Sequence, residues 1–358
     1  MGGKTRIILF AGYGVLFLAP LITNQFQINL LGRFLAYGIL ALGIDLIWGY
    51  TGILSLGHGV YFGLGAYCMA MYLKLEAAGT RLPDFMEWSG VTHMPAFWQP
   101  FHSFLFAFLS SVLLPLLLAA VVGYLSFRSR IRNVYFSILS QALVIIVTTL
   151  LIGEQGYTGG TNGLTDFATV FGQSLSSPWT QTILYVITLL VLGLVYVLSA
   201  CIVSSRLGRV LVSIRDGENR LRFLGYDPVR YKTFVYAFSG GIAGLAGALC
   251  VLQVGIISPG MMDIVPSVEM VLWVALGGRG TLYGAVIGAL LMNIAKSTFS
   301  DAFPDIWLFF LGGLFVAVVA FMQDGIVGVV KRSFIFFENR FGGVARERRR
   351  LANQQHQS

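Results

Sequence analysis

The stretch "DLIWGYTGILSLGHGVYFGLGAY", residues 45–67, decides which fold we expect of this chain. It places Asp45 and His58 inside apolar sequence and contains six glycines, which weaken a helix. Within a membrane, irregular backbone is tolerated only where protein or a water-filled cavity covers it. The stretch therefore predicts either a broken helix that lines a path through the protein or a plain turn between two closely packed helices.

The composition around this stretch indicates an integral membrane protein. Of the 358 residues, 56% are hydrophobic and 11% are charged, whereas soluble domains carry about 25% charged residues. The apolar residues form blocks of about 20, the length that a helix needs to cross about 30 Å of hydrocarbon. We expect an all-α polytopic membrane protein with about ten transmembrane helices. The expected spans are residues 7–23, 28–48, 58–75, 102–127, 133–152, 181–203, 233–254, 264–277, 281–296 and 306–323.

The basic residues predict the orientation, because Lys and Arg accumulate in short cytoplasmic loops. The loop 204–232 and the tail segment 331–350 each contain seven basic residues, and the loop 153–180 contains none. We therefore expect a transmembrane domain over residues 1–330 with both termini in the cytoplasm, and a basic cytoplasmic tail over 331–358. The net charge of +8 lies where orientation signals belong, so nucleic-acid binding is not expected.

One expected span, residues 264–277, is short for a full crossing. If it only dipped into the membrane, the basic tail would lie on the outer side, against the charge rule. We favour ten crossings, with "GGRGT" at 277–281 facing the cytoplasm, and nine crossings stay an alternative.

Four polar residues within or beside the spans are candidates for lining or gating a solute path: Asp45, Ser55, His58 and Glu269. A carboxylate inside a membrane is costly unless it is paired or hydrated. Glu269 is interpreted either as a residue of the path or as the partner of the neighbouring Arg279. A lone histidine near the start of a helix is more often a packing or capping group than a ligand.

A second glycine-rich stretch, "VALGGRGTLYGAVIGAL" at 274–290, follows Glu269. Three of its glycines, Gly280, Gly284 and Gly288, repeat every four residues, which predicts one helix face for close packing. Two glycine-interrupted segments in corresponding halves of a chain are also typical of a transporter site near the membrane midplane. The glycines expected to break or pack helices are Gly52, Gly57, Gly59, Gly63, Gly280, Gly284 and Gly288.

The loop 204–232 contains a short amphipathic helix, since Leu211, Ile214, Leu221 and Leu224 recur near helical spacing. A glycine and an Asp-Pro turn follow it. A helix that lies on the lipid surface and a helix that docks a soluble partner would both have this pattern. The defined stop and the rigid connection to the next span favour the docking helix.

The sequence offers no catalytic constellation. It lacks HExxH, CxxC, GxSxG and a phosphate-binding loop, and its three cysteines have no metal-ligand spacing. We expect no enzyme, no metal site and no bound cofactor. If nucleotide drives transport, another chain must hydrolyse it.

Five ordered segments together resemble the permeases of ABC importers for branched-chain amino acids and related solutes. They are "ALGIDLIWGYTGILSLGHGVYFGLGAY", "RIRNVYFSILSQAL", "GGTNGLTDF", "SSRLGRVLVSIRDGENRLRFLGYDPVRYKTFVYAFSGGIAGLAGAL" and "WVALGGRGTLYGAVIGALL". The resemblance covers nearly the whole chain. Within that group "ALGIDLIWGYTG", "LPDFM" and "FWQPF" look most like the urea-type permease, the longer of two membrane subunits.

The resemblance implies the partners and the place of action. It implies a heterodimer with a second permease in the bacterial inner membrane, two cytoplasmic ATP-binding subunits that use the ATP, and a periplasmic solute-binding protein. The helix around 215–225 would couple to an ATPase subunit. The residues that this assigns to coupling are Arg215, Asp216, Glu218, Leu221, Arg222 and Gly225.

The resemblance to the urea-type permease implies urea as the solute. The spans contain few charges, which is compatible with a neutral polar solute that needs hydrogen-bonding groups but no fixed counter-charge, and equally with a zwitterionic amino acid if the binding protein sets the specificity. A branched-chain amino acid importer is the alternative. A passive solute channel that needs neither ATP nor partners is the rival from another class, and the large cytoplasmic helix argues against it.

Overall fold

The computed structural model describes residues 12–131, 133–303, 306, 309–310, 312–313, 316–317 and 325–329. The start of the first expected span, most of the last one and the basic tail lie outside the described residues. The fold class is as the sequence predicts: the described chain is a bundle of α-helices, and six of them are long and apolar enough to cross a membrane.

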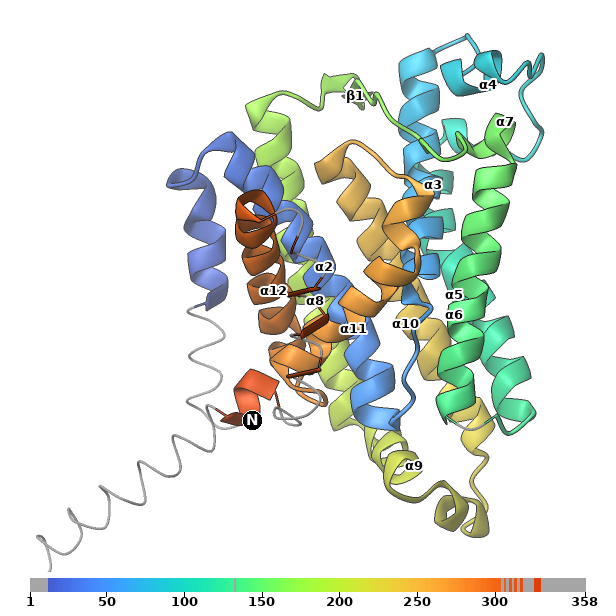
Figure 1. Ribbon diagram of the computed structural model, residues 1–358, viewed down its shortest axis with the longest axis vertical. Coiled ribbons are helices and arrows are strands. Elements are labelled where there is room, and N and C mark those ends of the chain that lie inside the picture. The colour runs from blue at the N-terminus through green and yellow to red at the C-terminus, as the bar shows by residue number, and fades with distance from the viewer. Residues whose placement is uncertain are drawn as a thin grey trace, which may run out of the picture.

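The long helices lie side by side in the bundle (Figure 1). A first apolar helix, Gly12–Leu21, ends in the 3-10 turn η1, Ala19–Leu21. The six long apolar helices are α2 (Gln25–Thr51), α5 (Phe104–Arg128), α6 (Asn133–Gly153), α8 (Pro178–Ser204), α10 (Pro228–Val254) and α12 (Leu282–Ala302). The others are α3 (His58–Ala78), α4 (Asp84–Trp88), η2 (Gln99–His102), α7 (Gln155–Thr158), α9 (Arg206–Phe223), η3 (Pro259–Met262) and α11 (Ile264–Gly277).

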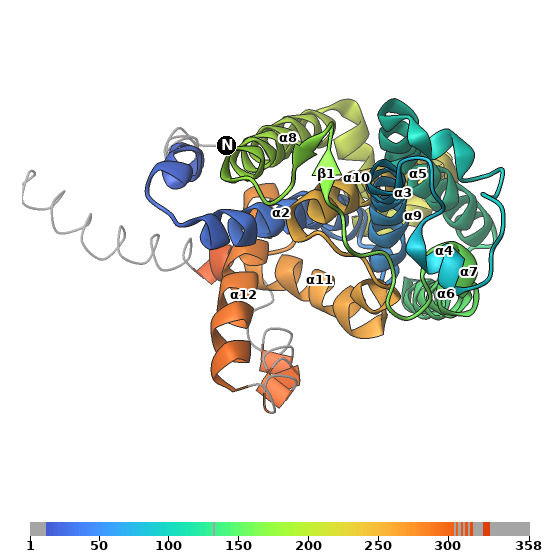
Figure 2. The same cartoon turned by 90° about the horizontal axis from the view of Figure 1, so that it is seen from above.

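The bundle has an inner and an outer layer. The most apolar windows of α2 and α10 are 83% buried, whereas those of α5 and α8 are 28% buried. Helix α10 packs against α2, α3 and α5 (Figures 1 and 2). An added Cβ at Gly247 would overlap the Phe62 carbonyl group, so a glycine is what lets α10 touch the α3 backbone. The outer helices turn their remaining apolar side chains outward, as expected for contact with lipid.

Different short elements lie at the two ends of the bundle (Figure 1). One end holds α4, α7 and the short antiparallel hairpin of β1 (Thr169–Val170) and β2 (Gln173–Ser174). There Lys74 donates to Asp84 at 3.1 Å and to the Thr165 carbonyl at 2.8 Å, which joins α3 to α4 and to the loop after α7. The other end holds α9, and we call it the α9 end. The loops 76–101 and 153–180 thus lie at the end opposite α9, as the orientation argument requires.

Helix α11 has 14 residues, about 21 Å at 1.5 Å per residue, so the helix by itself is shorter than the hydrocarbon layer. The 3-10 turn η3 precedes it (Figure 1). The turn that follows α11, residues 278–281, contacts the last turns of α2 at the α9 end. That placement agrees with "GGRGT" facing the same side as α9, while the total of ten crossings stays a prediction.

Candidate functional site

The first glycine-rich stretch contains a true break in the helices. Helix α2 ends at Thr51, the chain then runs without helix through residues 52–57, and α3 begins at His58 inside the bundle (Figure 1). Gly52 has φ of 76°, a left-handed conformation that glycine adopts without strain. At Gly57 an added Cβ would come within 2.8 Å of the Ser140 carbonyl oxygen of α6. The irregular segment is therefore covered by protein, as a membrane interior demands.

A buried polar cluster holds this segment against α10. The Nε2 atom of His58 lies 2.7 Å from Oγ of Ser239, and the Ser55 hydroxyl lies 3.3 Å from the Tyr236 hydroxyl. The Tyr61 and Tyr236 hydroxyls are 2.9 Å apart. All five side chains are buried. Because buried polar groups are stabilised by such pairing, these contacts hold the start of α3 against α10, while a role of Ser55 or His58 in the solute path stays a prediction.

The α9 end of α2 contacts the second glycine-rich stretch, and we call these contacts the α9 junction. Oδ1 of Asp45 accepts a hydrogen bond from the Gly280 N–H at 2.6 Å, and the Tyr50 hydroxyl donates to the Gly280 carbonyl at 3.0 Å. From α9, Nη1 of Arg215 donates to the Gly49 carbonyl at 2.8 Å. A single set of contacts therefore connects α2, the α11–α12 turn and α9.

One expected glycine position differs in the structure. Gly280 is not on the packing face of a helix, because it precedes α12 in a turn with φ of 75°. The other two glycines of that stretch do face α11: an added Cβ would come within 2.8 Å of the Gly277 carbonyl oxygen at Gly284, and within 2.6 Å of the Gly277 N at Gly288. Gly280 has the same four-residue spacing as Gly284 and Gly288 but lies before the first residue of α12, since sequence spacing does not reveal where a helix begins.

Gly59 and Gly63 have the same use on α3. A Cβ at Gly59 would come within 2.8 Å of the Met262 carbonyl oxygen, and one at Gly63 would overlap the Met262 side chain. These glycines let η3 pack directly on the first turns of α3.

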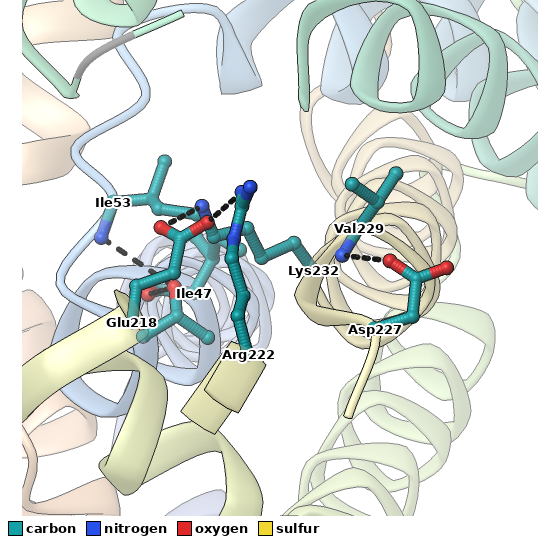
Figure 3. Close-up of polar contacts among 8 residues, drawn as sticks. Ile47, Ile53, Glu218, Arg222, Asp227, Val229 and Lys232 are labelled. Atoms are coloured by element: carbon teal, nitrogen blue, oxygen red, sulfur yellow. Dashed lines mark hydrogen bonds and ion pairs between the residues drawn. The ribbon is translucent and has the colours of Figure 1, made fainter. Parts of the chain in front are cut away.

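Helix α9 is longer than the predicted segment 215–225, and its polar residues have separate roles. It kinks at Gly217, and its buried side chains include Leu211, Ile214 and Leu221. Leu221 therefore packs inside the chain, and its part in coupling stays a prediction. Gly225 has φ of 85° and ends the helix, and the Asp227 side chain caps α10 by accepting from the Val229 N–H at 3.1 Å (Figure 3).

Several charged residues of α9 form contacts within the helix and with α2 and α10. Glu218 accepts hydrogen bonds from Arg222 at 2.6 Å and from Lys232 of α10 at 2.5 Å (Figure 3). Burial raises the pKa of Glu218, but the hydrogen bonds from these two cations outweigh burial and hold that pKa below its ordinary value of 4.5. Arg215 points to α2, and Asp216 pairs with it at 3.0 Å. These contacts fix the orientation of the α9–α10 corner.

The exposed part of this corner includes three large apolar side chains, which our sequence reasoning missed. Phe223 is 91% exposed, Leu224 is 74% exposed and Tyr226 is 45% exposed. Apolar side chains clustered at the tip of a polar helix are typical of a protein–protein contact. The signal was present in the sequence as "RFLGY", because Phe223 and Tyr226 fall outside the apolar face of the predicted helix.

A cavity lies between α2, α11 and α12, with a volume of about 470 Å³. The residues that line it include Arg33, Glu269 and Lys296 together with aromatic side chains. Glu269 pairs with Lys296 at 2.6 Å, so the expected pair with Arg279 is wrong: Arg279 is exposed in the α11–α12 turn, beyond the end of α11.

Of the four expected path residues, only Glu269 lines this cavity. Asp45, Ser55 and His58 are buried against protein partners. Sequence reasoning missed Arg33 and Lys296, although a basic residue within an expected span is itself a sign of function. Among the described residues no group of three or more His, Cys, Asp or Glu side chains could hold a metal ion.

The comparisons with known proteins agree on one family. The family described as branched-chain amino acid transport system / permease component matches residues 26–319. The chain is similar to the high-affinity branched-chain amino acid transport system permease protein LivM of Salmonella typhimurium, with 25% identity over 92% of this chain and 76% of the relative. It is also similar to LivH of the same organism and to BraD of Pseudomonas aeruginosa, each with 23% identity over 82% of this chain and 91% of the relative. No solved structure matches the chain significantly.

Proposed function

The chain belongs to the family of branched-chain amino acid transport system permease components, and from this membership we propose that it is a permease subunit of an ATP-driven importer of branched-chain amino acids. The relatives are transport permeases, and their printed names specify branched-chain amino acids. The urea expectation finds no support in these relatives, so the amino acid alternative is the one we propose.

The observation that carries the ATP-driven part of the proposal is the position of α9. This helix lies outside the long helices of the bundle (Figure 1), carries an exposed apolar tip at Phe223 and Leu224, and reaches α2 through Arg215. A partner that moved the tip would move α2 and the α11–α12 turn with it, because the α9 junction joins all three. A channel that opens without energy has no need of this connection.

We infer the partners from the same arrangement. The α9 end faces the cytoplasm of a bacterial inner membrane, where two ATP-binding subunits dock, one of them on the tip of α9. The loops at the opposite end face the periplasm and receive a solute-binding protein. Similarity to both LivM and LivH, two differently named permease proteins of one organism, supports a second permease of the same fold as the direct partner.

The substrate is tested by uptake in cells that lack this gene and in the complemented strain. We expect the deletion to abolish energy-dependent uptake of labelled leucine at low external concentration and complementation to restore it. Loss of urea uptake with normal leucine uptake would instead support the urea transporter. Unchanged uptake of both would contradict an importer for either solute.

The coupling role is tested by changing the exposed tip without touching the core. Phe223→Ala combined with Leu224→Ala should lower leucine uptake at least about tenfold, because apolar contacts at the centre of an interface contribute about 2 kcal/mol or more. Protein level in the membrane should stay unchanged, since both side chains are exposed. The matched control is Leu109→Ala with Leu113→Ala, two half-exposed side chains of α5 on the outer layer. Equal uptake by the tip variant and the control would contradict the assignment.

A further inference from the structure

The cavity between α2, α11 and α12 combines charges of both signs with an apolar wall. Figure 2 shows these three helices side by side, with α12 at the edge of the bundle away from α5 and α6. The charged residues that line the cavity, among the described residues, are one acid, Glu269, and two bases, Arg33 and Lys296. Each comes from a different helix, so packing and not local sequence assembles the set.

The two members of the ion pair differ in their exposure. Both carboxylate oxygens of Glu269 accept from Lys296, at 2.9 Å and 2.6 Å, and the Glu269 side chain is 6% exposed. Lys296 is 37% exposed and has a flexible stem. A buried carboxylate needs a cation, whereas a partly exposed ammonium group can withdraw into water. A ligand with an ammonium group can therefore replace Lys296 without leaving Glu269 unpaired.

Arg33 has hydrogen-bond donors to spare. Its Nε donates to the Tyr37 hydroxyl at 2.8 Å, and no described residue accepts from its two terminal nitrogens. A guanidinium group presents these donors in a planar fork that fits a carboxylate. Such a group beside a cavity favours a ligand with a carboxylate, because a neutral amide cannot form a charge-assisted, bidentate hydrogen bond with it.

The rest of the cavity is suited to an alkyl side chain. Phe62, Met270 and Trp273 line it, and Tyr37 packs against Trp273 with ring centroids 4.8 Å apart. Aromatic and methionine side chains favour burial of apolar surface and adapt to its shape.

We propose that this cavity binds a zwitterionic α-amino acid with an aliphatic side chain, whose ammonium group takes the place of Lys296 on Glu269 and whose carboxylate binds Arg33. The alkyl chain then lies against Phe62 and Trp273. This inference rests on the proposed function and names the groups that recognise the substrate within this chain. Urea has neither charged end, so it could not replace Lys296 on Glu269 and would give Arg33 no carboxylate.

The test locates the ligand directly. A diazirine analogue of leucine, which keeps both charged ends, is irradiated with membranes that contain the assembled transporter, and labelled residues are mapped by mass spectrometry. We expect labels on Phe62, Met270 or Trp273 that excess leucine displaces. Arg33→Gln and Glu269→Gln should each lower the labelling at least about tenfold, because each removes a charge-assisted contact. The matched controls Arg81→Gln and Glu87→Gln change exposed residues that do not line the cavity, and should keep full labelling.

A charge swap separates binding from folding. Glu269→Lys combined with Lys296→Glu keeps an ion pair between α11 and α12, so a purely structural role predicts recovery of labelling relative to Glu269→Gln. Recognition of the ligand predicts no recovery, because the carboxylate then lies on the more exposed side of the cavity. Recovery in the swap would overturn the inference.

The outcomes also distinguish the inference from the proposed function. Leucine uptake by the wild type with labels outside the cavity, or with full labelling of Arg33→Gln and Glu269→Gln, overturns the inference and leaves the proposed function intact. Absence of leucine uptake with displaceable labels in the cavity supports the inference and overturns the importer. Absence of both overturns both.

Discussion

Helix α2 carries polar groups at two places that differ in their surroundings. At Asp45 and Gly49 the polar atoms bond to Gly280 and Arg215 in the α9 junction, and Asp45 is 0% exposed. Twelve residues before Asp45, about 18 Å along the helix, Arg33 faces a cavity, and no residue that the structure describes accepts from its two terminal nitrogens. The first place is closed by protein and suited to transmit movement. The second is open and suited to bind a solute.

The difference shows that a charged residue in a membrane helix is not by itself evidence of a solute site. Asp45 and Glu269 look alike in the sequence, as single carboxylates near a glycine-rich stretch. Asp45 receives a backbone N–H, whereas Glu269 pairs with a partly exposed lysine beside a cavity. The partner and the free space, and not the residue type, separate the mechanical role from the binding role.

The largest effect is expected when a side chain is added at the α9 junction. In Gly49→Ala the added Cβ would lie 2.7 Å from the Gly280 Cα and would overlap the Asp45 carboxylate. Because packed interiors tolerate such overlap poorly, we expect the yield of monodisperse protein after detergent extraction to fall at least about tenfold, measured by size-exclusion chromatography. Gly153→Ala is the control, since no atom of another described segment lies within 4 Å of its Cβ position. A normal yield of Gly49→Ala would show that the junction is looser than described.

A smaller effect is expected when the carboxylates of Asp45 and Glu269 are removed one at a time, and its size should differ between the two variants. Asp45→Ala leaves the Gly280 N–H without its acceptor, which costs about 1–3 kcal/mol, and should lower the thermal unfolding temperature of the purified protein. Glu269→Ala should lower that temperature less, because Lys296 is 37% exposed and can be solvated. Uptake should show the reverse order in variants expressed at equal levels, with the greater loss of leucine transport per molecule at Glu269. The same order in both measurements would contradict the division of roles.

The smallest effect is expected from a change of pH, which acts on Glu218 at the α9–α10 corner. The pKa of Glu218 lies below its ordinary value of 4.5, so the ionised form stabilises the folded α9–α10 corner above the unfolded pKa. This stabilisation is constant between about pH 6 and 8 and is lost as the pH falls through the lowered folded pKa. The protection of residues 206–232 against hydrogen exchange in lipid nanodiscs, relative to the intrinsic exchange rate at each pH, should therefore fall on acidification below about pH 4.5.

The control for that measurement is Glu218→Gln, which cannot ionise. Its protection in the same residues should already be lower at neutral pH and should change little on acidification. An acid-induced change of equal size in the wild type and Glu218→Gln would assign the pH response to other groups. Asp216→Asn tests the exposed neighbour, whose pair with Arg215 is solvent-screened and should contribute little.

Much of the fold could be predicted from local sequence. Apolar length placed α2, α5, α6, α8 and α10 within a few residues of their bounds, because crossing hydrocarbon requires a continuous helix wherever the backbone is not otherwise covered. Gly225 and Pro228 fixed the α9–α10 corner, since glycine adopts the left-handed turn and proline begins a helix. The candidate site was less predictable: the sequence pointed to Glu269, but to the adjacent Arg279 as its partner.

The sequence by itself determined that this is a membrane-embedded helical protein with two glycine-rich segments and an amphipathic helix between its spans. Only the tertiary structure decided that Asp45 meets Gly280, that Glu269 meets Lys296 and that Arg33 joins them at one cavity. Hydropathy and helix signals act over a few neighbouring residues, so they can be read locally. Pairs between helices depend on the rotation and depth at which each helix packs, and side chains from many residues set both together.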